Sequence, residues 1–217
     1  MKQLDLPKGP LKVLCLGAHP DDIEIGCGGT LLQMLAERHE VQLLWVVFAA
    51  GGARRAEARA GAESFGKSAS SLRTIFHDFE DGFLPYAGES VKRCFEELKG
   101  EADPDLIFTH TRDELHQDHR LVNELCWNTF RNHLVLEFEI PKYDGDLGRP
   151  NLYVPLQRVT MDAKIERLMR CFPSQSKKDW FDEELFRGLA RVRGMECHAR
   201  DGYAESFHLR KGGLSLA

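Results

Sequence analysis

The stretch that decides the fold is LKVLCLGAHPDD, residues 11–22. Its first part, Leu11–Gly17, is a nearly continuous apolar run, as expected of a strand that is buried on both faces of a sheet. A polar segment, AHPDD at residues 18–22, follows at once. Polar side chains placed directly after a buried strand are typical of open parallel sheets, which bind ligands at the carboxyl ends of their strands.

Strand-like and helix-like segments alternate outward from this stretch. Strands are expected at residues 41–49, 73–76 and 105–109, and helices at residues 31–39, 54–65, 90–98 and 115–131. Residues 26–30 (GCGGT) are expected to form a flexible turn between the first strand and the first helix. The alternation predicts βαβ units with right-handed crossovers. The predicted fold class is therefore α/β, a Rossmann-like three-layer sandwich with a mainly parallel sheet.

The pattern is less regular after residue 131. Further strands are expected at residues 135–140, 152–154 and 204–209, further helices at 162–171 and 183–193, and a loop at 141–150, which is dense in Pro, Gly and Asp. At 217 residues the chain has the length of one sizeable core and is too short for two independent domains. We expect a single domain over residues 1–217.

Composition excludes several classes of protein. The chain has 29 basic and 34 acidic residues, a net charge of −5, which gives no electrostatic argument for nucleic acid or for an anionic membrane surface. No apolar stretch approaches the roughly 20 residues needed to span a bilayer. Residues 1–10 lack the layout of a secretory signal, so a cytoplasmic protein is expected. Its 6 cysteines form no C-x-x-C pair and are expected to be free, mostly buried thiols.

A second polar motif, HQDH at residues 116–119, follows the strand expected at residues 105–109. Because parallel strands end at the same edge of a sheet, this motif should meet the AHPDD segment there. If HQDH opens a helix, its histidines are three positions apart and lie on one face. Together the motifs supply two histidines and a carboxylate for a divalent cation, and leave an aspartate and a histidine for proton transfer. His110, directly after the strand, could line the pocket, but a hydrogen-bonded structural role is the preferred interpretation.

Each motif also has an ordinary structural interpretation. Pro-Asp-Asp is a common turn or helix N-cap sequence, and paired histidines on a helix are more often surface residues than ligands. The placement of both motifs after buried strands favours the metal site over two unrelated coincidences.

At these residues the chain resembles the LmbE-like/PIG-L family of zinc-dependent N-acetylglucosaminyl deacetylases. The resemblance is carried by GAHPDDIEIGCGGT (residues 17–30) and by HQDH (residues 116–119). Weaker family-like features are Arg54-x-x-Glu57, the DGFLP turn at residues 81–85, and Tyr203-Ala-Glu205-x-Phe207. The resemblance implies that His19, Asp22 and His119 bind the metal.

The resemblance also implies roles for other residues. Asp21 would be the general base, and His116 would stabilise the oxyanion or act as an acid. Asp118 is expected to orient or tune His116, and Arg54 matches an arginine that contacts substrate in some relatives. Many relatives have a glutamate directly after the two aspartates; here Ile23 stands in that position, so Glu24 is given no role.

The resemblance implies N-deacetylation of an amino sugar or an amino-sugar conjugate, a small-molecule substrate, by metal-activated water. Zn²⁺ is the expected cofactor, although a His₂Asp ligand set also suits Fe²⁺, Co²⁺ or Mn²⁺. The alternatives are another metallohydrolase, an amidase or phosphoesterase acting on a non-sugar substrate, and a non-catalytic sugar- or nucleotide-binding module. Homo-oligomerisation stays open, because many members of the family are homo-oligomers. Which of Asp21 and His116 protonates the leaving amine is also left open.

Overall fold

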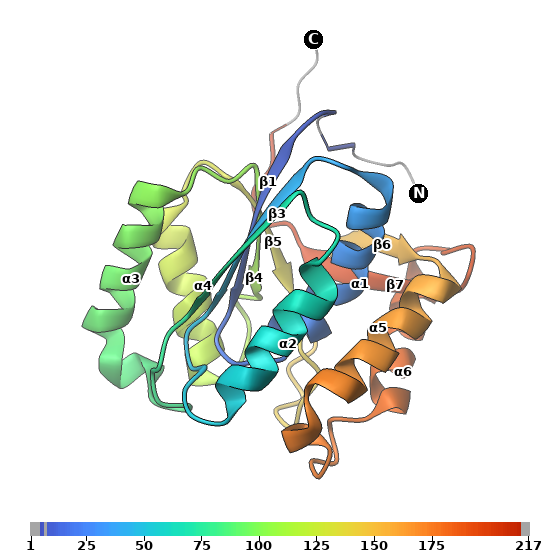
Figure 1. Cartoon of the computed structure of the whole chain (residues 1–217). Helices are drawn as coiled ribbons and strands as arrows, with labels where there is room; N and C mark the ends of the chain where they lie inside the picture. The colour runs from blue at the N-terminus through green and yellow to red at the C-terminus, as the bar shows by residue number, and fades with distance from the viewer. Residues whose placement is uncertain (1–4, 7, 214–217) are drawn as a thin grey trace.

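A computed structural model describes residues 5–6 and 8–213 and shows one seven-stranded sheet between two layers of helices (Figure 1). The strand order is β3-β2-β1-β4-β5-β7-β6. The strands are β1 (Leu11–Gly17), β2 (Val41–Val47), β3 (Ser71–Phe76), β4 (Leu106–His110), β5 (Leu134–Phe138), β6 (Leu152–Leu156) and β7 (Tyr203–His208). The helices are α1 (Asp22–Glu37), α2 (Arg54–Gly66), α3 (Gly88–Glu101), α4 (Gln117–Thr129), α5 (Arg158–Cys171) and α6 (Glu183–Glu196), with short 3₁₀ turns η1 (Leu84–Ala87) and η2 (Pro173–Gln175).

The sheet is parallel from β3 to β5, and its far edge is antiparallel. β1 pairs in parallel with β2 and with β4, and β5 extends the parallel part. β7 then pairs antiparallel with both β5 and β6. The predicted α/β class and mainly parallel sheet are confirmed.

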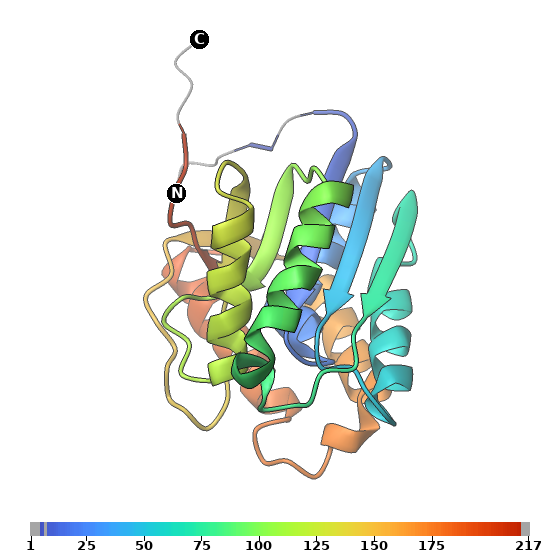
Figure 2. The same cartoon turned by 90° about the vertical axis from the view of Figure 1, so that its left-hand side faces the viewer.

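Two layers of helices explain why β1 is apolar along its length. Helices α1, α2, α5 and α6 cover one face of the sheet, and α3 and α4 cover the other (Figures 1 and 2). Val13 and Cys15 belong to the core on the first face, whereas Leu14 and Leu16 belong to the core on the second. Since successive side chains of a strand point to opposite faces, a central strand between two cores needs apolar residues at all of its covered positions, and in β1 only Lys12 is exposed.

The expectation of a flexible turn at residues 26–30 was wrong, because α1 already begins at Asp22 and includes them. The glycines permit close packing rather than a turn. A Cβ on Gly26 would lie 2.3 Å from the ring of Phe138, and one on Gly28 would lie 2.6 Å from Phe65. The helix therefore sits tightly on its neighbours, and its N-terminus is fixed at the end of β1.

Two further features agree with the composition. All 6 cysteines are free thiols. Among the residues that the structure describes, no helix is both long and apolar enough to cross a membrane.

Candidate metal centre

The carboxyl end of β1 turns sharply into α1 at Asp21. This residue has φ 100° and ψ −25°, in the left-handed region that non-glycine residues rarely adopt. Backbone strain of this kind is concentrated at functional sites, where the surrounding structure maintains it. The carboxylate Oδ2 of Asp22 accepts the backbone N–H of His19 at 2.7 Å, which closes the turn.

The three predicted ligands come together at this turn. His19 Nδ1 lies 3.1 Å from His119 Nε2, although the two residues are 100 positions apart. Asp22 completes the triangle, with Oδ2 at 3.5 Å from His19 Nδ1 and Oδ1 at 3.5 Å from His119 Nε2. Ligands at ~2.0–2.1 Å from a tetrahedral cation are roughly 3.3–3.4 Å apart. The three side chains therefore lie at distances compatible with a His₂Asp metal site, with Asp22 presenting a different carboxylate oxygen to each histidine.

The electrostatics of the cluster also favour a cation. Burial lowers the pKa of His119, as suits a ligand that must be neutral. Burial acts the same way on His19, but hydrogen bonds to Asp118, Asp22 and Asp81 outweigh it and hold the pKa of His19 well above its ordinary value. Because Asp118 and Asp81 contact Nε2 of His19, they favour a proton on that nitrogen and leave Nδ1, which faces His119 and Asp22, to bind a cation.

His110, at the end of β4, is a third imidazole in the cluster. Its Nε2 accepts the backbone N–H of Ala18 at 3.0 Å and lies 3.2 Å from Asp22 Oδ2. Its ring stacks on that of His119, with 3.9 Å between centroids. The hydrogen bond to Ala18 agrees with the expected structural role. The same ring also lies close enough to Asp22 and His119 to form an alternative donor set with them.

Asp118 contacts a different histidine from the one predicted. Its buried carboxylate lies 3.0 Å from His19 Nε2 and accepts the backbone N–H groups of Gly82 and Leu84 at 2.8 and 3.1 Å. It is the backbone N–H of Asp118, rather than its carboxylate, that meets His116. The Asp118 carboxylate thus orients His19 and not His116, which corrects one half of the expectation that it orients or tunes His116. The reason is the docking of the 81–85 turn onto α4, which brings the carboxylate towards the ligand. The charge of Asp118 does raise the pKa of His116, as a tuning group would.

His116 is the N-cap of α4 and is half-buried. Its Nδ1 accepts the backbone N–H of Asp118 at 3.3 Å, so Nε2 carries the proton of the neutral ring. Burial, together with the nearby His19, lowers the pKa of His116 below its ordinary value. A neutral His116 is therefore favoured at neutral pH, with Nε2–H available as a hydrogen-bond donor.

Asp21 is buried beside a guanidinium. Arg54, the first residue of α2, donates through Nη2 to Asp21 Oδ2 at 3.0 Å and also to the backbone oxygen of Pro20. Burial raises the pKa of Asp21 to about 7, while the charge of Arg54 acts in the opposite direction. A carboxylate that titrates near neutral pH is suited to general base catalysis. The neighbouring Arg55 instead pairs with Asp78 at 3.0 Å.

Sequence reasoning missed two partners of the predicted ligands. Glu114 Oε2 lies 2.5 Å from His119 Nδ1, and Asp81 Oδ1 lies 3.0 Å from His19 Nε2. Metal-binding histidines commonly donate their other ring nitrogen to a carboxylate. The signal for Glu114 was its position two residues before His116, and the signal for Asp81 was the DGFLP turn.

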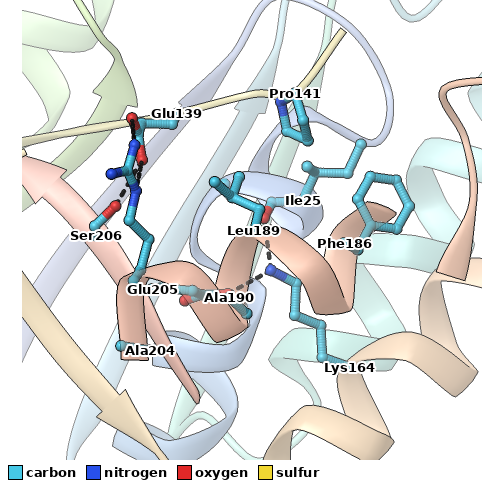
Figure 3. Close-up of a pocket in the computed structure, with 12 residues that line it drawn as sticks. Ile25, Glu139, Pro141, Lys164, Phe186, Leu189, Ala190, Ala204, Glu205 and Ser206 are labelled. Carbon is cyan, nitrogen blue, oxygen red and sulfur yellow. Dashed lines mark hydrogen bonds and ion pairs between the residues drawn. The ribbon is translucent and has the colours of Figure 1, made fainter. Parts of the chain in front are cut away.

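A separate cavity, shown in Figure 3, lies between α1, α6 and β7. It measures about 30 Å³, which is room for about two waters and not for a sugar. Its wall includes the buried Lys164, whose Nζ donates to Glu205 Oε1 and to the backbone oxygen of Ile25, both at 2.6 Å. Glu205 Oε1 and Oε2 in turn accept the backbone N–H groups of Gly29 and Thr30. These contacts bind α5 and β7 to α1, so the cavity is structural.

The fold and the clustered side chains define an α/β protein with a candidate metal centre at the carboxyl edge of its sheet. The family model for GlcNAc-PI de-N-acetylase, PIG-L, matches residues 14–130, more than half of the chain. The chain therefore belongs to the PIG-L family, which confirms the resemblance seen in its motifs. A search of curated protein sequences found no significant match.

Solved structures share the fold at low sequence identity. N,N'-diacetylchitobiose deacetylase from Pyrococcus horikoshii superposes with a TM-score of 0.71 at 23% identity, covering 93% of this chain and 84% of that one. Teicoplanin deacetylase Orf2 gives 0.68 at 16%, covering 90% and 96%. The 4-carboxy-2-hydroxymuconate hydratase GalB from Pseudomonas putida gives 0.74 at 17%, covering 95% and 99%. Since one of these is a hydratase, the fold alone does not define the reaction.

Proposed function

We propose that this protein is a metal-dependent N-deacetylase that removes the N-acetyl group from an amino sugar or an amino-sugar conjugate. The observation that carries the proposal is the triangle of His19, Asp22 and His119 donor atoms with Asp21 beside it. Membership of the GlcNAc-PI de-N-acetylase family and the structural likeness to two deacetylases support the choice of substrate.

His19, Asp22 and His119 would hold the cation. A divalent metal, with Zn²⁺ preferred and Fe²⁺, Co²⁺ or Mn²⁺ as alternatives, would supply Lewis acidity that polarises the amide carbonyl and acidifies water. Asp21 would accept a proton from the attacking water while the water oxygen bonds to the acyl carbon. Arg54 holds the Asp21 carboxylate in place for this transfer.

His116 would act on the other side of the reacting carbonyl. Its Nε2–H would donate to the oxyanion that forms when water adds, and so stabilise the tetrahedral state. When the C–N bond breaks, the amine would receive the proton held by Asp21, giving acetate and the free amino sugar. The pKa of Asp21 near 7 suits a group that must both accept and return a proton.

The proposal is tested by substrate screening of the purified protein after loading with each of the four metals. The panel contains free N-acetylglucosamine, its nucleotide conjugates, its glycosides and larger N-acetyl amino-sugar conjugates, together with N-acetyl amino acids and an aryl phosphate. Acetate and free amine should appear in equal amounts from an amino-sugar member, and Asp21→Asn is the inactive control.

The other results of the screen would favour the alternatives. Turnover of the N-acetyl amino acids alone would indicate an amidase, and turnover of the aryl phosphate alone a phosphoesterase. Binding of a sugar without turnover, with every metal tested, would indicate a binding module.

A further inference from the structure

A lysine with a largely covered side chain connects loop 141–150 to the candidate metal centre. Lys142 Nζ contacts Glu114 Oε1 and both carboxylate oxygens of Asp146, the latter at 2.7 and 2.6 Å. The side chains of Lys142, Glu114 and Asp146 are only 8%, 1% and 5% exposed. Burying three ionisable groups has a large desolvation cost, which the hydrogen bonds among them offset.

The second oxygen of Glu114 extends this cluster to a predicted metal ligand. Glu114 Oε2 lies 2.5 Å from His119 Nδ1, while the opposite nitrogen of that ring, Nε2, faces His19 and Asp22. A proton on Nδ1, donated to the glutamate, leaves the Nε2 lone pair directed at the metal position. The orientation and tautomer of His119 therefore depend on where Glu114 is held.

Asp146 attaches the loop a second time. Its Oδ2 accepts the backbone N–H of Leu115 at 2.8 Å, and Leu115 lies between Glu114 and His116. Two residues of the loop thus hold the segment that precedes α4. Lys142 contacts the side chain of Glu114, and Asp146 accepts the backbone N–H of Leu115.

We propose that Lys142 and Asp146 are positioning residues for His119, acting through Glu114, so that docking of loop 141–150 sets the affinity of the centre for its metal. The proposal rests on the proposed function only in assuming that a metal binds here. It assigns these residues no contact with substrate.

Zinc affinity of the metal-free full-length chain tests this, measured by competition with a chromogenic chelator. Lys142→Met should weaken Zn²⁺ binding by roughly 10–100-fold, the usual effect of losing a partner behind a metal ligand. Lys92→Met is the matched control, since it also removes a lysine ion pair, the exposed one with Glu96. The control should bind Zn²⁺ as the native protein does.

A double variant separates positioning from general damage. Glu114→Gln and Lys142→Met both act on the imidazole of His119. The double variant should therefore bind Zn²⁺ with about the affinity of whichever single variant binds it less tightly. Additive losses, or native affinity in Lys142→Met, would overturn the proposal. If thermal unfolding shows that Lys142→Met does not fold, Asp146→Asn gives the decision, since its shape is retained: weaker Zn²⁺ binding supports the proposal and native affinity overturns it.

The measurement uses no substrate and is therefore independent of the proposed reaction. A protein that shows this pattern of zinc affinities but releases no acetate would contradict the proposed deacetylation alone. A protein that releases acetate, with zinc affinity unaffected by Lys142→Met, would contradict the positioning role alone.

Discussion

Arg54 Nη2 lies 3.0 Å from Asp21 Oδ2, which places a positive charge from the start of α2 against the candidate base at the start of α1. The contact depends on the close packing of these two helices. The adjacent Arg55 instead pairs with Asp78, at 3.0 Å.

Replacing Arg54 with Met should move the acidic limb of the kcat/KM profile to higher pH. The charge of Arg54 lowers the pKa of Asp21, which burial raises to about 7. Without that charge the pKa rises further, so less of the active carboxylate is present at a given pH and activity falls more at pH 6 than at pH 9. Arg55→Met is the control and should leave the limb in place. If the acidic limb of the kcat/KM profile does not move in Arg54→Met, that limb does not report the titration of Asp21.

Asp21→Asn should retain the metal and lose turnover. Asparagine tolerates the left-handed backbone that this position requires, so the turn should persist. The amide cannot accept the proton of water, and we expect kcat to fall by roughly 10²–10⁴-fold. Metal analysis and steady-state kinetics on one preparation check both statements. Near-native turnover would show that a different group acts as the base.

Single Ala substitutions of His19, Asp22 and His119 should remove the metal together with activity. Each supplies one corner of the donor triangle, and two remaining ligands make a weak site, because the neighbouring His110 already accepts the backbone N–H of Ala18 through Nε2. His133→Ala, which alters a histidine near the exposed Asp103, is the control and should keep its metal. Stoichiometric metal in all three ligand variants would disprove the assignment.

His116→Ala should keep the metal, lower kcat by about 10²–10³-fold, and leave any alkaline limb of the pH profile unchanged. The rate effect is that of removing one oxyanion donor. The pH effect follows because burial lowers the pKa of His116, so the ring works in its neutral form and is not lost as the pH rises. An alkaline limb that disappears in this variant would instead show that an imidazolium at position 116 is the essential acid.

Gly26→Ala should destabilise the protein even though alanine favours helices. The new methyl would lie 2.3 Å from Phe138, and such overpacking costs about 1–3 kcal/mol, against a gain of ~1 kcal/mol in helix propensity. Gly188→Ala in α6 is the matched control, because its Cβ would meet no atom within 4 Å. Urea denaturation should show lower stability for the first and equal or higher stability for the second. Equal effects would show that packing at Gly26 is unimportant.

The sequence by itself determined the parallel part of the sheet and the meeting of the two motifs. Both results follow from local patterns: the apolar run of β1 requires two covered faces, and parallel strands must end at one edge. His19 and His119 could therefore be brought together without any knowledge of packing. The resemblance carried by the same motifs added the expected ligands, and the family it named is confirmed.

Other features depended on contacts that no local pattern records. Residues 26–30 look like a turn, yet they lie within α1, where the glycines let Phe138 and Phe65 approach the helix closely. Asp118 faces His19 because the 81–85 turn docks on α4, and Glu114 meets Lys142 across 28 positions of the chain. Such pairings arise when buried charges and donors must find partners in the packed structure. The tertiary structure alone decided which carboxylate lies beside which histidine, and which loop contacts Glu114.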